Sequence, residues 1–197
     1  HAAQSSLAGP HPLQRRDGER RAAAQQRLGG GPDEVLRGSL RSGAGLAVMV
    51  VPDSLVPTAS ALQICATVRG VADTGTGAFA EEAAKQILEM KADVAVIGPG
   101  LGSDPGTVAM VHELVRNLPI PFVLDADGLN AFSKSPDLLA QSRSLKILTP
   151  HPMEMSRLIQ RSVEEIQTDR KQIAIEAARK FNAVCLLKGH RTVISDG

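Results

Sequence analysis

The sequence lacks the features that mark secreted, membrane-bound or nucleic-acid-binding proteins. Its 197 residues carry a net charge of only +1, which gives no strong field to attract nucleic acid or an acidic membrane. No apolar run approaches the ~20 residues that span a bilayer. The N-terminus has no apolar stretch followed by a small-residue cleavage site. We therefore expect a cytoplasmic protein that binds neither nucleic acid nor membranes.

Cysteine is also scarce. The two cysteines, Cys65 and Cys185, lie far apart in the sequence and have apolar neighbours. Small secreted scaffolds carry far more cysteine, so we expect two buried, reduced thiols rather than a disulfide framework. The chain is long enough for one α/β domain with a substantial core, and short for two.

Residues 1–34 differ in composition from the rest of the chain. They contain no Val, Ile, Phe, Met or Lys, and consist largely of Ala, Arg, Gly, Gln and Pro. Their three leucines are too sparse to form an apolar stripe on a helix or a strand. This composition predicts an atypical segment that is disordered or non-native, followed by a structured domain over residues 35–197.

From Glu34 onward, short apolar runs alternate with amphipathic helical patterns. Val56–Val71 is ambiguous, and Asp73–Gly77 is a loop. We predict strands at Leu46–Val51 (a buried central strand), Val94–Ile97, Pro121–Leu124, Leu145–Leu148, Val184–Leu187 and Val193–Ser195, with the last one turning back. We predict helices at Glu34–Ser42, Ala78–Met90, Pro105–Leu118 and Val163–Phe181. Since the strands carry little charge, we expect a mostly parallel sheet covered on both faces, in a three-layer α/β/α fold.

The stretch Asp93–Thr107, DVAVIGPGLGSDPGT, reads as a strand, a glycine-rich turn and the start of a helix. The glycines allow positive φ angles and let a ligand approach the main chain. The helix that follows offers unpaired N–H groups to an anion. A dinucleotide-binding fingerprint would need glycine at position 103, where Ser103 stands. The stretch therefore predicts either a phosphate-bearing ligand or a simple tight turn.

Polar sequence also follows three later strands, at 125–130, 149–154 and 188–192. Since parallel strands point the same way, these loops and the glycine turn should gather at one edge of the sheet. Asp125 and Asp127, two residues apart, could bind Mg²⁺ or a hydroxyl, or could form turn and helix-cap hydrogen bonds. Asn130 could bind a polar ligand or act as a cap.

His151 and Glu154 are three residues apart near a helix start, so their side chains can meet each other or one ligand. Glu154 could instead be a first-turn acid favoured by the helix dipole. No second His or Cys cluster accompanies them, so we predict no zinc site. Lys188 and Gly189 place an ammonium and an approachable backbone after an apolar strand, as a phosphate partner or as a solvated lysine.

Four segments together resemble the ADP/ATP-dependent NAD(P)H-hydrate dehydratase family, whose fold is ribokinase-like. They are VIGPGLG (96–102), PFVLDADGLN (121–130), LTPHPMEMSRL (148–158) and LLKGHRTVI (186–194). The similarity covers residues 37–197, in order and with suitable spacing. It implies a lyase of nicotinamide nucleotide repair. ADP or ATP phosphorylates the C6 hydroxyl of (6S)-NAD(P)H hydrate, and loss of phosphate restores NAD(P)H.

The resemblance also implies roles for individual residues. Gly98, Gly100 and Gly102 would line the hydrate site together with residues 151–157, which include His151 and Glu154. Asp127 and Asn130 would line the region of the phosphoryl group and Mg²⁺. The ADP phosphates or ribose would be contacted by Lys188, Gly189, His190, Arg191 and Thr192. The family implies NAD(P)H-hydrate epimerase as a partner and a homo-oligomeric assembly.

Two departures from the family pattern lead us to expect an incomplete copy with little activity of its own. The glycine-rich strand and loop expected before Ser42 are absent from residues 1–34. The glycine-rich segment carrying the catalytic aspartate is expected beyond residue 197. A ribokinase-like kinase acting on a vitamin-precursor alcohol, a non-catalytic nucleotide-binding remnant and a fragment that does not fold are the alternative interpretations.

Overall fold

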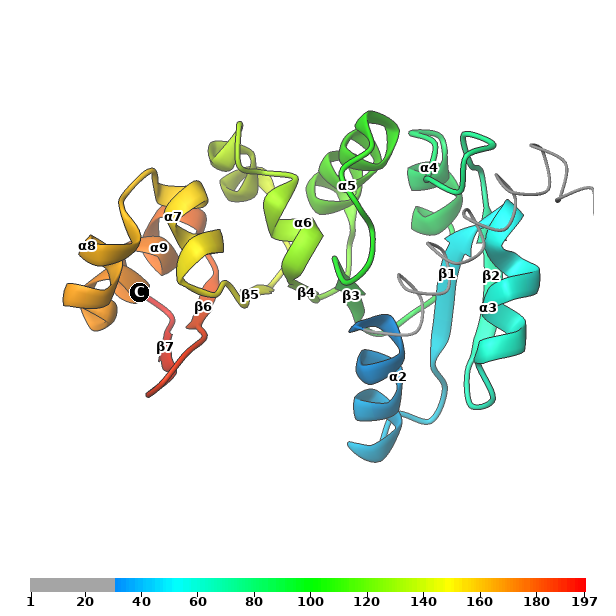
Figure 1. Cartoon of the computed structure of the whole chain (residues 1–197), viewed down its shortest axis with the longest axis horizontal. Helices are drawn as coiled ribbons and strands as arrows, with labels where there is room; N and C mark the ends of the chain where they lie inside the picture. The colour runs from blue at the N-terminus through cyan, green and yellow to red at the C-terminus, as the bar shows by residue number, and fades with distance from the viewer. Residues whose placement is uncertain (1–30) are drawn as a thin grey trace, which may run out of the picture.

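A computed structural model describes residues 31–197 of the chain (Figure 1). The prediction for residues 1–34 therefore falls almost wholly outside the described residues. The helices are α2 (Gly31–Arg41), α3 (Val56–Leu62), α4 (Ala83–Leu88), α5 (Pro105–Asn117), α6 (Ala126–Asn130), α7 (Pro152–Ile159), α8 (Val163–Thr168) and α9 (Arg170–Phe181), with 3-10 turns η1 (Asp53–Leu55) and η2 (Pro136–Gln141). The strands are β1 (Val48–Pro52), β2 (Thr67–Val71), β3 (Ala95–Ile97), β4 (Phe122–Leu124), β5 (Lys146–Leu148), β6 (Val184–Leu187) and β7 (Val193–Ser195).

The strands form a mostly parallel α/β fold, as predicted. Five strands lie in the order β3-β4-β5-β6-β7, with β3 to β6 parallel and β7 antiparallel to β6. Strands β1 and β2 pair in parallel as a separate sheet. Figure 1 shows β3 to β6 side by side, with α5, α6 and α7 beside them. The parallel order confirms that the loops after β3, β4, β5 and β6 share one edge.

Two predicted helices differ in extent from those in the structure. The helix predicted at Ala78–Met90 is shorter, because Phe79 forms a β-bridge with Asp73 and α4 begins only at Ala83. The helix predicted at Val163–Phe181 is broken at Asp169, which leaves helical geometry and caps α9 by accepting a hydrogen bond from the Gln172 N–H. Helix α2 also begins at Gly31, three residues before the expected start.

The first strand and one cysteine also differ from expectation. Within residues 31–197, β1 pairs with β2 alone and its Val48 is exposed, so it is not a buried central strand there. The segment Val56–Val71, which the sequence left ambiguous, contains helix α3 followed by strand β2, and η1 immediately precedes it. Cys65 is exposed, because it lies in the turn between these two elements rather than in the core. Cys185 is buried, and burial raises the pKa of its thiol to about 12.

No helix among residues 31–197 has the length and apolar character needed to cross a bilayer. The main core lies between the five-stranded sheet and the helices that cover it, with Phe122, Phe132 and Phe181 among its largest fully buried side chains. Helix α9 contacts β6, β7 and η2, while α5 contacts α4 and η2. A second, smaller cluster around Met49 and Val51 holds α3 to β1 and β2.

Lys146, the first residue of β5, is an unusual member of this interior because its side chain is fully buried. Its ammonium donates a hydrogen bond to the Ser142 carbonyl oxygen at 3.2 Å. Within residues 31–197 no carboxylate forms an ion pair with it. Burial without a counter-charge lowers the pKa of Lys146 and disfavours its charged form.

The ends of β3 and β4 approach each other closely at Gly98 and Asp125. The Asp125 N–H donates to the Ile97 carbonyl oxygen at 3.0 Å, and the Gly128 N–H donates to the Asp125 carbonyl oxygen at 2.9 Å. Gly98 has a φ of 140°, and a β-carbon at this position would collide with the Asp125 carbonyl. Glycine is therefore required here both by backbone conformation and by space.

We expect Lys146→Met to raise the melting temperature, by about 2–4 °C for each kcal/mol gained. Methionine has similar length and removes the buried charge. Because the pKa of Lys146 is lowered in the folded state, the cost of the charge is full at pH values below that folded pKa. It disappears as the pH rises past the unfolded value near 10.5, so the gain should shrink in alkaline solution. Thermal unfolding across pH measures this.

The matched control for that experiment is Lys171→Met, the same substitution at an exposed position on α9, which should leave the melting temperature nearly unchanged. A destabilised Lys146→Met variant, or a gain independent of pH, would show that the ammonium is better satisfied than its single hydrogen bond indicates.

We expect Gly98→Ala to destabilise the chain by roughly 3 kcal/mol or more, because it combines a disfavoured φ with a backbone collision. Gly38→Ala is the control, since a β-carbon there meets nothing within 4 Å and the residue lies inside α2. It should gain about 0.5–1 kcal/mol. Urea unfolding followed by circular dichroism compares the two, and equal stability of both variants would refute the crowding at Gly98.

Candidate functional site

The glycine turn after β3 is held open by a carboxylate from the next loop. Gly100 and Gly102 both have positive φ angles, near 75°. The Gly102 N–H donates to the Asp127 side chain at 2.8 Å. Asp127 lies in the first turn of α6, so it fixes the shape of the turn by hydrogen bonding to a backbone 25 residues earlier in the chain. The Asp127 side chain thus accepts a backbone hydrogen bond, but from the distant glycine turn rather than from the turn in which Asp127 itself lies.

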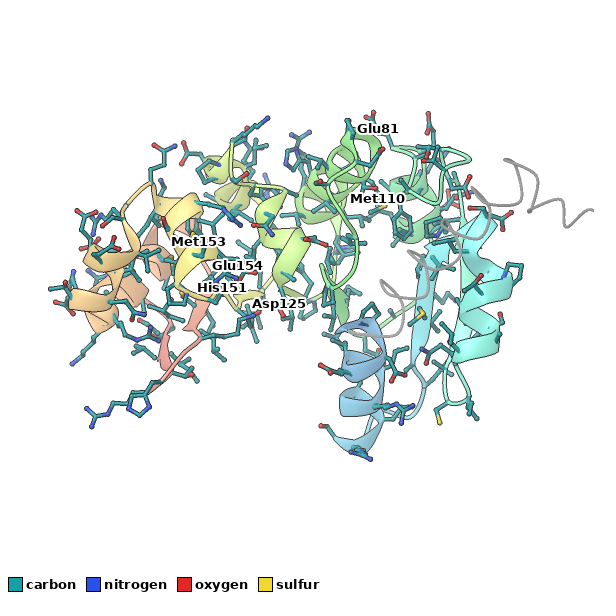
Figure 2. The ribbon with its side chains drawn as sticks, viewed as in Figure 1. Glu81, Met110, Asp125, His151, Met153 and Glu154 are labelled. Atoms are coloured by element: carbon teal, nitrogen blue, oxygen red, sulfur yellow. The ribbon has the colours of Figure 1, made fainter. Side chains whose placement is uncertain are left out.

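Lys188, directly after β6, connects three of the loops at the sheet edge. Its ammonium lies 2.6 Å from Oδ1 of Asp125 and 4.0 Å from Oε2 of Glu154. Asp125 follows β4, and Glu154 lies in the first turn of α7 after β5. The Glu154 side chain is only 5% exposed, whereas that of Lys188 is 37% exposed. Figure 2 shows Asp125 and Glu154 close together on this edge.

Asp125 and Asp127 do not act as a pair, although the two-residue spacing allowed this. Asp125 is the N-cap residue of α6 in position, but its side chain makes no cap hydrogen bond and turns to Lys188 instead. Asp127 faces the glycine turn. The reason is that the chain enters α6 at Ala126, so the two carboxylates are no longer on one face of a strand.

His151 and Glu154 meet, as their spacing predicted, and together cap α7 (Figure 2). Nδ1 of His151 accepts hydrogen bonds from the N–H groups of Met153 and Glu154, at 3.1 and 3.3 Å. The ring proton must then be on Nε2, which lies 3.2 Å from Oε1 of Glu154. The other Glu154 oxygen accepts from the His151 N–H at 2.9 Å. Glu154 is thereby fixed on both oxygens.

The remaining predicted residues are spread around this centre. Asn130 accepts a hydrogen bond from Arg157 at 2.8 Å, so α6 and α7 are joined beside the site. In the loop after Lys188, Gly189 has a φ of 142° and Arg191 a φ of 57°, and the Thr192 hydroxyl donates to the Gly189 carbonyl oxygen. His190 and Arg191 are exposed and form no ion pair within residues 31–197.

A cavity of about 390 Å³ opens beside the glycine turn, and Asp125 also lines it. Its lining comes from α2, the turn and the start of α6: Gly31, Glu34, Val35, Pro99, Gly100, Asp125 and Ala126. The sequence did not indicate that α2 contributes to the site. The only usable signal was its acidic first turn, which is equally typical of an ordinary helix start.

No group of three or more His, Cys, Asp or Glu side chains is arranged to hold a metal ion in the part of the chain that the structure describes. Two carboxylates, Asp125 and Glu154, do lie on either side of the Lys188 ammonium. Mg²⁺ often binds through one or two carboxylates together with the phosphates of a nucleotide. This donor set is chemically suited to Mg²⁺ that arrives with a nucleotide, and unsuited to a resident metal.

The sheet edge combines a glycine turn with an approachable backbone, the Lys188 ammonium and the carboxylates of Asp125 and Glu154, and of these groups Gly100 and Asp125 also line the cavity. These groups can hold a phosphate-bearing ligand and neutralise its charge. None of the side chains is placed as a nucleophile with an adjacent general base, so the site favours positioning and electrostatic stabilisation over covalent catalysis.

Comparisons with known proteins agree with the resemblance in the sequence. A family model described as NAD(P)H-hydrate dehydratase matches residues 30–197. The chain is 40% identical over 159 residues to the bifunctional NAD(P)H-hydrate repair enzyme Nnr of Moorella thermoacetica, covering 80% of this chain and 30% of that protein. Nnr of Thermofilum pendens is 33% identical over 175 residues, covering 88% and 33%. The chain thus spans about a third of the length of these relatives.

A solved structure shares the fold. The ADP/ATP-dependent NAD(P)H-hydrate dehydratase from Bacillus subtilis, co-crystallised with ATP/Mg²⁺, superposes with a TM-score of 0.60 and 26% identity, covering 90% of this chain and 57% of that chain. The expected ribokinase-like fold is therefore confirmed. Because the family model matches most of its length, the chain belongs to the NAD(P)H-hydrate dehydratase family.

Proposed function

We propose that this chain takes part in the ADP-dependent dehydration of (6S)-NAD(P)H hydrate to NAD(P)H, with ATP as the alternative phosphoryl donor. The observation that carries the proposal is the position of Lys188, whose ammonium lies 2.6 Å from Asp125 and 4.0 Å from Glu154 at the same sheet edge as the glycine turn. An ammonium that can pair with phosphate and a backbone that a ligand can approach lie at one edge. This combination suits a reaction in which both the donor and the acceptor carry phosphate groups. Membership of the family supports the choice of substrate.

The chemistry follows from the leaving group. Hydroxide leaves carbon poorly, whereas phosphate leaves readily. The C6 hydroxyl oxygen of the hydrate therefore attacks the terminal phosphorus of ADP, the P–O bond to AMP breaks, and the hydroxyl proton is released to solvent. In the second step the C6–O bond breaks with its electron pair going to phosphate, and a proton leaves the neighbouring ring carbon to restore the double bond. Phosphoryl transfer of this kind depends chiefly on positioning and charge neutralisation.

Each part of the site has a role in this proposal. Lys188 would bind the transferring phosphate, with the backbone of Gly189 and the exposed side chains of His190, Arg191 and Thr192 close to the rest of the nucleotide. Mg²⁺ would supply further neutralisation of the phosphate charge. Asp125 and Glu154, which now face the ammonium, are the residues suited to hold it.

The cavity beside the glycine turn is the proposed hydrate site. Pro99 and Gly100 of the turn line it, Gly98 and Gly102 lie next to them in the chain, and Asp127 keeps the turn in this shape. Such a pocket can receive a nicotinamide ring with its adjoining phosphate close to the main chain. On this basis Asp127 supports the hydrate site indirectly, while Asn130 holds Arg157 next to it.

We also propose the setting of the reaction. Both cysteines of the chain are unpaired, which suits the reducing environment of the cytoplasm. The relatives are named bifunctional repair enzymes, which supports an NAD(P)H-hydrate epimerase as the functional partner. A homo-oligomer and a partial ribokinase-like NAD(P)H-hydrate dehydratase domain over residues 35–197 complete the proposal.

The central test is ADP-dependent recovery of the near-ultraviolet absorbance of NADH from purified NADH hydrate. We expect recovery at a low rate, in keeping with the two departures from the family pattern, with release of AMP and free phosphate in equal amounts. The Bacillus subtilis dehydratase serves as the positive control. Recovery by that enzyme but none by this chain, even at high enzyme concentration, would contradict the proposal. A product that keeps its phosphate would identify a ribokinase-like kinase instead.

We expect Lys188→Met to reduce kcat/KM for this reaction by about 10²-fold, the usual effect of removing one positioned donor to a developing charge. Lys171→Met on the exposed side of α9 is the matched control and should retain activity. Measuring steady-state rates against ADP concentration separates weaker binding from slower chemistry. Full activity in Lys188→Met would exclude the ammonium as the phosphate partner.

A further inference from the structure

Arg170, the first residue of α9, reaches across to the end of β6. Its Nη2 donates to two successive carbonyl oxygens, those of Leu187 at 2.8 Å and Lys188 at 3.1 Å. Its Nη1 donates to the side chain of Gln167 at 2.9 Å. The Arg170 side chain has no role in the site described above. It nevertheless holds the backbone of Lys188, whose ammonium is the proposed phosphate partner.

The peptide groups of Lys188 are fixed on both sides as a result. Its N–H donates to the Pro150 carbonyl oxygen at 2.8 Å, and its C=O accepts from Arg170. Pro150 immediately precedes His151 in the loop after β5, so one tether comes from the loop that carries Glu154 and the other from α9. With both ends of the residue held, its side chain leaves the backbone in one direction, toward Asp125.

Gly189 is matched to the same guanidinium. A β-carbon at Gly189 would lie 3.1 Å from both Nη1 and Nη2 of Arg170, and the φ of 142° is also one that other residues rarely adopt. The two Nη atoms of the guanidinium therefore lie close to the bare backbone of the loop. A glycine here allows the close approach, and Arg170 in turn keeps this flexible residue in one conformation.

The contact is kept even though it leaves a polar group unsatisfied. Nε of Arg170 is buried and has no hydrogen-bond partner within the described residues. A buried donor without a partner opposes folding, and a surface arginine would avoid this by turning toward water. The side chain remains in place because its Nη groups pack against the loop after β6. Nη2 also donates to the carbonyl oxygens of Leu187 and Lys188 at the end of that strand.

We propose that Arg170 is the positioning residue for Lys188: it fixes the loop after β6 so that the ammonium is already placed to receive a phosphate. Arg170 acts through Lys188 and touches no ligand itself. The inference rests on the proposed function for its ligand, but the loop geometry on which it depends is independent of that function. Pre-ordering the loop lowers the conformational entropy lost when the nucleotide binds.

The first experiment measures ADP affinity by calorimetry for wild type, Arg170→Met, Arg170→Lys and the control Arg161→Met. Arg161 forms an ion pair with Glu176 of α9, the helix that begins at Arg170. Arg161→Met therefore also removes a guanidinium contact to α9. We expect Arg170→Met to weaken ADP binding by about tenfold, as for loss of one charge-assisted contact. Lysine at 170 should restore part of it, since one ammonium can donate to the carbonyl oxygens but lacks the planar fork that also holds Gln167, and Arg161→Met should bind normally.

A double-mutant cycle with Lys188→Met separates positioning from direct contact. If Arg170 acts through Lys188, Arg170→Met should weaken ADP binding no further once Lys188 is gone. Additive losses would show that Arg170 meets the nucleotide itself, and unchanged affinity in the single Arg170→Met variant would show that the loop needs no support. Either result overturns the inference.

Hydrogen exchange of the ligand-free protein provides a readout that does not depend on the proposed function. The Lys188 amide, bonded to Pro150, should exchange at least about tenfold faster in Arg170→Met than in wild type, while the Leu148 amide in the core of the same sheet changes little. Equal exchange at Lys188 overturns the inference. Failure of wild type to bind ADP, with this local acceleration present, would overturn the proposed function and leave the positioning role supported.

Discussion

The ion pair between Lys188 and Asp125 is the interaction on which the arrangement of the site depends. It joins residues 63 positions apart, at the ends of β6 and β4, and Glu154 joins the same cluster from the first turn of α7, which follows β5. A parallel sheet makes this possible, because all three strands end at one edge. The cluster is partly open to solvent, so its contribution lies in orienting the groups rather than in stability.

Around this ion pair, each loop is fixed by hydrogen bonds from a different part of the chain. Asp127 shapes the glycine turn, His151 holds both Glu154 and the start of α7, and Gly98 allows the first two loops to approach. The backbone of each loop is thereby held by a contact from a different segment. This division fits a reaction in which positioning matters more than covalent chemistry.

The sequence predicted the alternation of strands and helices and the shared edge, because apolar runs and glycine-rich turns are local signals. It did not predict the break at Asp169, because the helical pattern continues on both sides of this residue. Asp169 leaves the helix and caps the next one, as aspartate often does. It also missed Arg170 and the α2 lining of the cavity, since both depend on contacts between distant segments. The exposure of Cys65 had the same origin: its apolar neighbours do not face the core.

The Lys188 ammonium is already paired with Asp125 before any ligand arrives, and this has a consequence for binding. A phosphate that takes the Lys188 ammonium removes the counter-charge of Asp125, so the net gain is only the difference between two ion pairs. Asp125 and the buried Glu154 are then free to receive a cation that enters with the nucleotide. We infer that nucleotide and Mg²⁺ bind together more tightly than either alone, because each supplies the partner that the other displaces.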